Sequence, residues 1–226
     1  MKLDIIYRCC NAEVEGNFKW IRPDFFDKIK CLKTFLNAVD YSSDVINSVI
    51  FLHDGPKGRL YNNIPKNFEI IEVDYKDNEK SLLETFKIAD RLNNHIYFVE
   101  DDYLHLKNSI NTIYHGVLNF KLVTGYDHLD RYTRSDDITM GKDYVAFSKK
   151  TNSHWRTCES TCCTWACTRE LWNSNLREAS YKFKLEDRKL FRFLFSEKNI
   201  RLWNPIPGVT TQVDSNLTPC INWKDL

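Results

Sequence analysis

Residues 96–102 have the sequence IYFVEDD, in which four apolar residues are followed directly by three carboxylates. A short apolar run of this kind is typical of a buried strand. Three adjacent carboxylates repel one another, so folding gains nothing from them unless a cation lies nearby. Mg²⁺ and Mn²⁺ bind one or two carboxylates and complete their coordination with water and substrate phosphates. Glu100, Asp101 and Asp102 are therefore a candidate metal–diphosphate site, and the alternative is a solvated acidic turn.

Strand and helix patterns alternate on both sides of this stretch. Strands are expected at residues 3–7, 45–52, 68–73 and 96–99, and helices at 25–39, 81–92 and 110–118, with Pro23 in the first turn of the first helix. This alternation predicts an α/β/α sandwich with a mainly parallel central sheet. Ligands of such sheets bind beyond the carboxyl ends of the strands. Arg8, Asp54 and the acidic triplet all fall there.

The carboxyl-terminal half is less regular. Residues 126–142 are polar and acidic, strands are plausible near 143–148 and 162–167, and residues 185–198 have the apolar spacing of a helix. We find no repeat and no linker. We therefore expect one domain over residues 1–226, with a nucleotide-binding half (1–102) and an acceptor-binding half (103–226).

Composition excludes some classes of function. The chain has 32 Lys and Arg against 31 Asp and Glu, whereas nucleic-acid binders usually carry a basic excess. No apolar run is long enough for a signal peptide or a membrane span, so we expect a cytoplasmic protein of open oligomeric state. Of the eight cysteines, the cluster at residues 158–167 could be a zinc site. Its spacing favours buried thiols instead.

The strand that ends in an acidic triplet resembles the DXD motif of GT-A-fold nucleotide-sugar glycosyltransferases. Further motifs are similar, in the same order, to those of the small glycosyltransferases of large algal (chlorella) viruses and some bacteria. These motifs are Tyr126-Asp127-His128 with Arg131-Tyr132, His154-Trp155-Arg156 before Ser160-Thr161, Glu186-Asp187-Arg188, and the tail from Pro207-Gly208 through Thr210-Thr211-Gln212 to Pro219 and Trp223. The likeness covers nearly the whole chain, and it would place the protein in the host cytoplasm if it is viral.

The resemblance implies a metal-dependent, inverting glycosyltransferase with a nucleotide-sugar donor, by family habit a UDP-sugar, and a sugar or glycan hydroxyl as acceptor. Asp102, with Glu100 or Asp101, would hold Mn²⁺ or Mg²⁺ and assist departure of the diphosphate. Arg8 and Asp54 would lie beside the nucleoside.

The resemblance also implies roles in the second half of the chain. Asp187, or Glu186 in its place, would be the general base that takes the proton of the acceptor hydroxyl. The alternative is that the helix dipole favours acids at this helix start. Asp127 and His128 would orient the acceptor, and Trp155 would stack on a sugar face unless it belongs to the core.

One position departs from the family pattern and two other classes of function remain open. Relatives carry a histidine that completes the metal shell where this chain has Gln212, a weaker neutral ligand. A non-catalytic glycan- or nucleotide-binding domain is one alternative. A nucleotidyltransferase is the other, and we rank it last because Arg8-Cys9-Cys10-Asn11 contains none of the glycines expected after the first strand.

Overall fold

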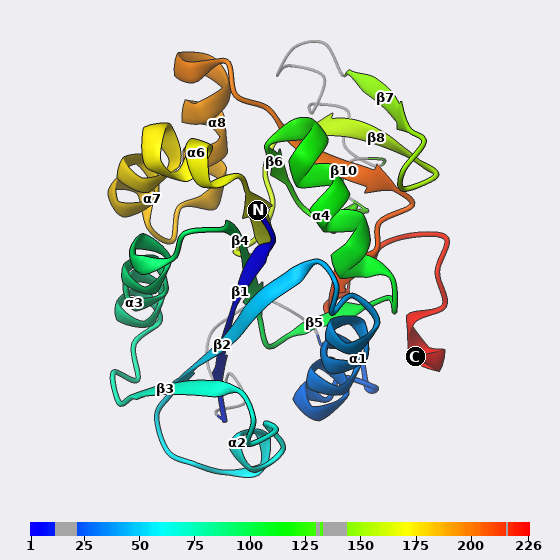
Figure 1. The fold of residues 1–226 in the computed structure, drawn as a ribbon. Coiled ribbons are helices and arrows are strands. Elements are labelled where there is room, and N and C mark those ends of the chain that lie inside the picture. Colours follow the sequence, from blue (N-terminus) through cyan, green and yellow to red (C-terminus); the bar gives the residue numbers. More distant parts are fainter. Residues whose placement is uncertain (12–21, 130–131, 133–143, 216) are drawn as a thin grey trace.

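The computed structural model describes residues 1–11, 22–129, 132, 144–215 and 217–226. It is a single α/β domain in which a nine-stranded sheet lies between two layers of helices (Figure 1). The strand order is β3-β2-β1-β4-β9-β6-β10-β8-β7. The predicted sandwich and its Rossmann-like sheet are confirmed.

The first four strands in this order are parallel. They are β1 (Leu3–Cys10), β2 (Ile46–Asp54), β3 (Glu69–Val73) and β4 (His95–Glu100). β1 is an interior strand, between β2 and β4, and its apolar residues are buried on both faces, as expected for a strand covered by helices on each side. In the register, Arg8 lies opposite Glu100 and Cys10 lies opposite Asp54. The carboxyl ends of β1, β2 and β4 therefore meet at one edge.

The other half of the sheet has mixed direction. Its strands are β6 (Leu122–Val123), β7 (Val145–Ser148), β8 (Ser153–Cys158), β9 (Trp165–Cys167) and β10 (Leu202–Ile206). β9 runs antiparallel between β4 and β6, and β8 runs antiparallel to both β10 and β7, while β6 and β10 are parallel. Unbroken parallel pairing thus ends at β4, but β6, β10 and β7 run in the same direction as β4, so the sheet is mainly parallel as predicted.

Two groups of helices cover the two faces (Figure 1). On one face lie α1 (Lys28–Tyr41) and α4 (Ser109–Phe120), whose apolar residues pack with Ile5 and Tyr7 of β1. On the other lie α3 (Asn78–Arg91), α7 (Arg177–Phe183) and α8 (Asp187–Lys198), packed around Phe98 of β4. Successive side chains of β1 and β4 point to opposite faces of the sheet, so they pack against different groups of helices.

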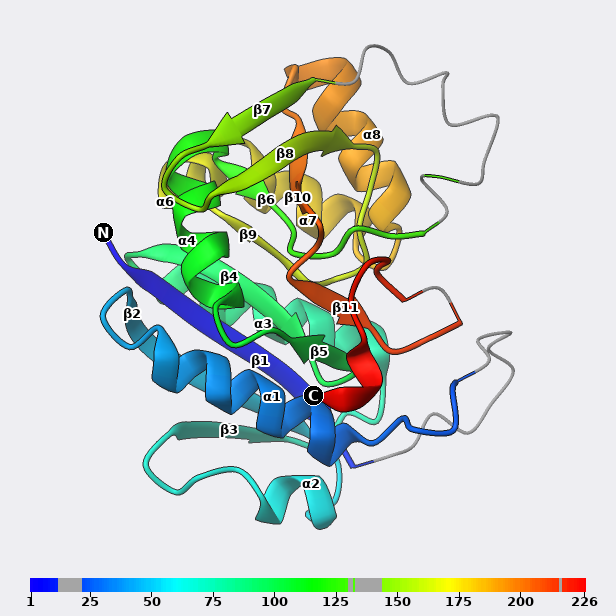
Figure 2. The same cartoon turned by 90° about the vertical axis from the view of Figure 1, so that its right-hand side faces the viewer.

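Shorter elements complete the fold. They are α2 (Arg59–Asn62), α6 (Arg169–Leu171), a π-helix (Trp172–Leu176), a 3-10 helix (Trp223–Asp225), and the two antiparallel strands β5 (Tyr103–His105) and β11 (Thr210–Gln212). Figure 2 shows the β5–β11 pair and the 3-10 helix beside α1. Cys31, Leu104, Val213 and Trp223 form a small apolar cluster there. This cluster fixes the tail of the chain against the end of β4.

Two expectations about element boundaries are wrong. Pro23 does not begin the first helix. α1 begins at Lys28, because the Asp27 side chain accepts a hydrogen bond from the Ile29 amide (2.9 Å) and caps it. The strand expected over residues 162–167 contains only Trp165–Cys167.

One further finding concerns membranes. Within the described ranges, every helix is too short or too polar to cross a bilayer.

Candidate functional site

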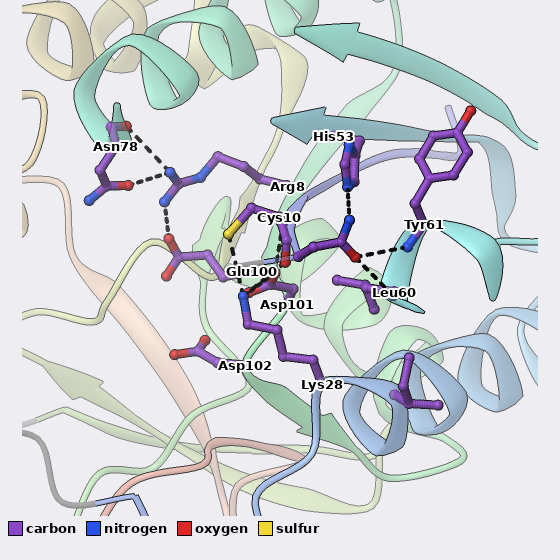
Figure 3. A network of polar contacts seen from close by, with 12 residues as sticks. Arg8, Cys10, Lys28, His53, Leu60, Tyr61, Asn78, Glu100, Asp101 and Asp102 are labelled. Carbon is purple, nitrogen blue, oxygen red and sulfur yellow. Dashed lines mark hydrogen bonds and ion pairs between the residues drawn. The ribbon is translucent and has the colours of Figure 1, made fainter. Parts of the chain in front are cut away.

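Charged side chains from β1, β4 and α1 gather at the carboxyl edge of the parallel strands (Figure 3). Arg8 donates hydrogen bonds to Glu100 and to the side chain of Asn78, which lies at the start of α3. Burial raises the pKa of the Glu100 carboxyl, and the Arg8 charge only partly opposes this rise. This pair occupies the α3 side of the edge.

Asp101 forms a second ion pair on the α1 side. Its Oδ2 accepts hydrogen bonds from the Lys28 Nζ (2.9 Å) and from the Cys10 amide (2.9 Å). Lys28 also donates to the Cys10 carbonyl at 3.0 Å. Burial lowers the pKa of Lys28, but the Asp101 charge, the neighbouring Cys10 and the hydrogen bonds to both together outweigh it and hold the pKa above its usual range. α1 therefore presents a charged ammonium to the end of β1.

Asp102 is bound on one oxygen only. Its Oδ2 accepts from Arg22 (2.7 Å) and from the Gln212 amide nitrogen (2.9 Å). Its Oδ1 is buried and has no hydrogen-bond partner in the described part of the chain. An unpaired buried carboxylate oxygen is costly, so its position suits a bound cation. If this edge binds a metal cation, Asp102 is the residue that would hold it.

The remaining predicted ligands fit a metal less well. Among the described residues, no three His, Cys, Asp or Glu side chains are grouped to hold a metal ion. Glu100 is engaged by Arg8, and the Gln212 side chain turns its amide nitrogen to Asp102. A divalent cation at Asp102 would therefore take one protein carboxylate and complete its coordination with water and, when a nucleotide is bound, with phosphate oxygens, a pattern typical of Mg²⁺.

Asp187 lies at the start of α8, close to the Arg8–Glu100 pair. Both of its carboxylate oxygens are 3.5 Å from the Cys163 Sγ. Arg8, Glu100, Cys163 and Asp187 line a narrow space of about 10 Å³ between α3 and α8, which is enough for about one water. Burial and the charge of Glu100 raise the pKa of Asp187 to about 7. Glu186 instead forms an exposed pair with Lys189.

The other predicted nucleoside contact has a structural partner. Asp54 is 8% exposed, and its Oδ1 accepts hydrogen bonds from the amides of Tyr75 (2.7 Å) and Lys76 (3.0 Å). This contact fixes the turn after β3. Asp54 lies at the predicted edge, but at least one of its carboxylate oxygens is already hydrogen-bonded to backbone amides of the chain.

The predicted acceptor residues form a separate polar cluster. Asp127 is 1% exposed and accepts hydrogen bonds from Arg156 (3.0 Å), Asn204 (3.0 Å) and Tyr132. The ring of His128 lies 5.1 Å from that of Tyr126. Arg131 and most of the loop 126–142 lie outside the described residues.

Trp155 belongs to the core. It is fully buried, and a Cβ on Gly116 of α4 would come within 2.3 Å of its ring. The indole therefore has no open face for a sugar. The expectation of sugar stacking is corrected to a packing role.

Four residues of the edge were not foreseen from the sequence: Arg22, Lys28, Asn78 and Cys163. Lys28 and Asn78 stand at helix starts that point at the edge, and a rule joining helix starts to strand ends could have identified them. Arg22 and Cys163 lie in irregular segments, where no periodic pattern indicates their direction.

The comparisons with known proteins found solved structures with a similar fold and no similar sequence. No family model and no curated protein matches the sequence. A bifunctional IspDF from Campylobacter jejuni matches with 13% identity and a TM-score of 0.49, over 90% of this chain and 49% of that one. The chain thus spans about half the length of that enzyme.

Two further solved structures have a similar fold. A CMP:2-keto-3-deoxy-manno-octonic acid synthetase, solved with CTP, matches with 10% identity and a TM-score of 0.48, over 92% of this chain and 93% of that one. A mycobacterial protein matches with 11% identity and a TM-score of 0.52, over 90% of this chain and 64% of that one. Likeness at such low identity shows the fold and not the activity.

These comparisons correct the glycosyltransferase prediction. None of the three structures is described as a glycosyltransferase, and one is a synthetase of a CMP-linked product. They also give no support to a link with algal viruses. The criterion of glycine in residues 8–11 did not consider Arg22 and Lys28, two cations that other elements bring to the same edge.

Proposed function

We propose that this chain binds the phosphates of a nucleoside triphosphate at the carboxyl edge of β1 and β4 and transfers the nucleotidyl group to an acceptor. The observation that carries the proposal is the arrangement of Lys28 and Arg22, which bring two cations from outside the sheet to this edge. Arg8 adds a third cation on the α3 side. Cations at the switch edge of an α/β sheet are suited to phosphate binding.

The chemical step follows from this placement. An oxygen of the acceptor attacks the α-phosphorus, and the bond from that phosphorus to the α–β bridging oxygen breaks. Pyrophosphate then leaves with the electron pair of that bond. Lys28 and Arg22 neutralise the negative charge that grows on the leaving group. A divalent cation bound at Asp102, when present, supplies Lewis-acid stabilisation of the same charge.

Asp187 is the proposed general base in this reaction. Its pKa of about 7 suits a group that must accept a proton near neutral pH. Glu186 remains its proposed substitute, and its exposed pair with Lys189 makes it the weaker choice. Asp187 would accept the proton of an acceptor hydroxyl or of a protonated acceptor phosphate. An acceptor oxygen that is already ionised would attack without this proton transfer.

The division of labour along the chain is also part of the proposal. Residues 1–102 supply Arg8, Lys28 and the acidic triplet for the nucleotide. Residues 103–226 supply Asp187 and the cluster of Asp127 and His128, which we assign to the acceptor.

Calorimetric titration with ATP, CTP, GTP and UTP, each with Mg²⁺ and then with EDTA, tests the binding step. We expect one of them to bind, and Lys28→Met to weaken that binding about tenfold or more, the loss of one charge-assisted contact (about 1.4 kcal/mol or more). Lys33→Met is the matched control, because Lys33 is an exposed lysine of the same helix.

Two outcomes would contradict the proposal. Binding of none of the four nucleotides would refute the site. Binding that is equally strong in the Lys28→Met and Lys33→Met variants would refute the assigned role of Lys28. Release of pyrophosphate in the presence of candidate acceptors would then test transfer, and binding without release would indicate a non-catalytic nucleotide-binding domain.

A further inference from the structure

Among the residues that the structure describes, each carboxylate of the acidic triplet pairs with one cation. Arg8 pairs with Glu100, Lys28 with Asp101 and Arg22 with Asp102. The side chains of Arg8 and Lys28 are 13% and 10% exposed, whereas that of Arg22 is 28% exposed. Arg22 is therefore the most accessible cation of the three.

Arg22 also has the simplest route of release. It does not belong to a strand or helix, and it is held by Asp102 Oδ2 (2.7 Å), the Val213 carbonyl (2.6 Å) and the ring of Phe26, whose centroid lies 4.6 Å from its guanidinium carbon. Lys28, by contrast, is fixed in the first turn of α1. Arg22 can leave Asp102 without moving a strand or a helix.

The free oxygen of Asp102 makes this contact relevant to metal binding. Oδ1 is buried and unpaired in the described part of the chain, while Oδ2 carries Arg22. A divalent cation on Oδ1 would share the carboxylate with a guanidinium, which is charged at every accessible pH. Two cations on one small carboxylate repel each other strongly where water is scarce.

We propose that Arg22 is an internal, removable cation that competes with a divalent metal ion for Asp102. Before the metal binds, Arg22 compensates the buried carboxylate. When the metal binds, Arg22 leaves Asp102 and its guanidinium becomes available for a phosphate of the nucleotide. This rests on the proposed function only for that last step, since the competition itself involves no nucleotide.

The competition predicts that removing the Arg22 charge strengthens metal binding. Mn²⁺ alone is the probe, and its free concentration is followed by electron paramagnetic resonance without nucleotide. We expect Arg22→Gln to bind Mn²⁺ about tenfold more tightly than the wild type, which corresponds to about 1.4 kcal/mol. Asp102→Asn should abolish this binding in both backgrounds.

Two further variants make the result specific. Arg22→Lys keeps the positive charge and should bind Mn²⁺ no more tightly than the wild type. Arg59→Gln removes an exposed arginine that pairs with Asp27 and not with the triplet, and it should also leave Mn²⁺ binding unchanged. Circular dichroism of each variant reports whether the fold is retained, and Arg22→Met is the second neutral variant that preserves the comparison if Arg22→Gln does not fold.

The inference is overturned if Arg22→Gln binds Mn²⁺ with the same or lower affinity than the wild type, or if no protein binds Mn²⁺ at Asp102. A tighter Mn²⁺ complex in Arg22→Gln would support the inference even if no nucleoside triphosphate binds. Failure of the proposed function and failure of this inference are therefore distinguishable.

Discussion

Replacing Asp187 by asparagine should change how the stability of the protein depends on pH. The folded protein raises the pKa of this carboxyl from 3.8 to about 7, so the folded state binds the proton more tightly than the unfolded chain does. Stability from this group is then fully present below pH 4 and is lost as the pH rises through 7. At about 1.36 kcal/mol for each pKa unit, the upper limit of the loss is ~4 kcal/mol.

Solvent reduces this figure, because the side chain is only half-buried. We expect about half of the limit, ~2 kcal/mol, between pH 4 and pH 8. The assay is urea unfolding followed by tryptophan fluorescence at both pH values. The wild type should lose ~2 kcal/mol more than Asp187→Asn over this interval. Glu186→Gln is the control, since Glu186 is the exposed neighbour, and it should follow the wild type.

Parallel pH profiles for the wild type and Asp187→Asn would refute the reasoning. They would mean that Asp187 titrates at the same pH in the folded and unfolded states. Its burial against Glu100 would then not perturb its proton affinity, and its choice as a base near neutral pH would lose its physical ground.

Three other substitutions have defined outcomes. Gly116→Ala should destabilise the protein by ~3 kcal/mol in thermal or urea unfolding, because the new Cβ would lie 2.3 Å from the Trp155 ring. A neutral or stabilising effect would contradict this and show that the Trp155 ring can shift to make room for the methyl group. Lys28→Met should cost 3–5 kcal/mol, as roughly expected when one partner of a buried ion pair is removed, and Lys28→Met combined with Asp101→Asn should recover part of the loss. Asp27→Ala should cost about 1 kcal/mol through the lost cap of α1, and Asp27→Ser should recover most of it.

The sequence predicts the parallel half of this fold well for a physical reason. Each of the first four strands is a short apolar run next to an amphipathic helix, so both periodicities are visible. The edge site follows from the same pattern, because the register of parallel strands brings Arg8 opposite Glu100. In this half of the fold, the local sequence pattern is therefore enough to predict where these residues lie in the structure.

The rest of the site depends on contacts that the sequence does not display. β6 has two residues and β9 has three, which is too short for an alternating pattern to be read. Lys28 reaches Asp101 from 73 positions away, and Arg22 reaches Asp102 from 80. Such pairs arise because α1 and the residues just before it (22–27) pack against the sheet. The core position of Trp155 is likewise set by a single glycine on α4.

The position of β1 between β2 and β4 has a consequence for how the chain folds as it is synthesised. β1 pairs with β2, about 45 residues later, and with β4, about 90 residues later. Until residues 95–100 leave the ribosome, one side of β1 has no strand beside it, and an apolar strand in this state is prone to wrong pairing. The three ion pairs of the edge cannot form earlier either, since Glu100 is the last residue of β4 and the other two acids follow it. The binding edge is therefore assembled only when the parallel sheet closes.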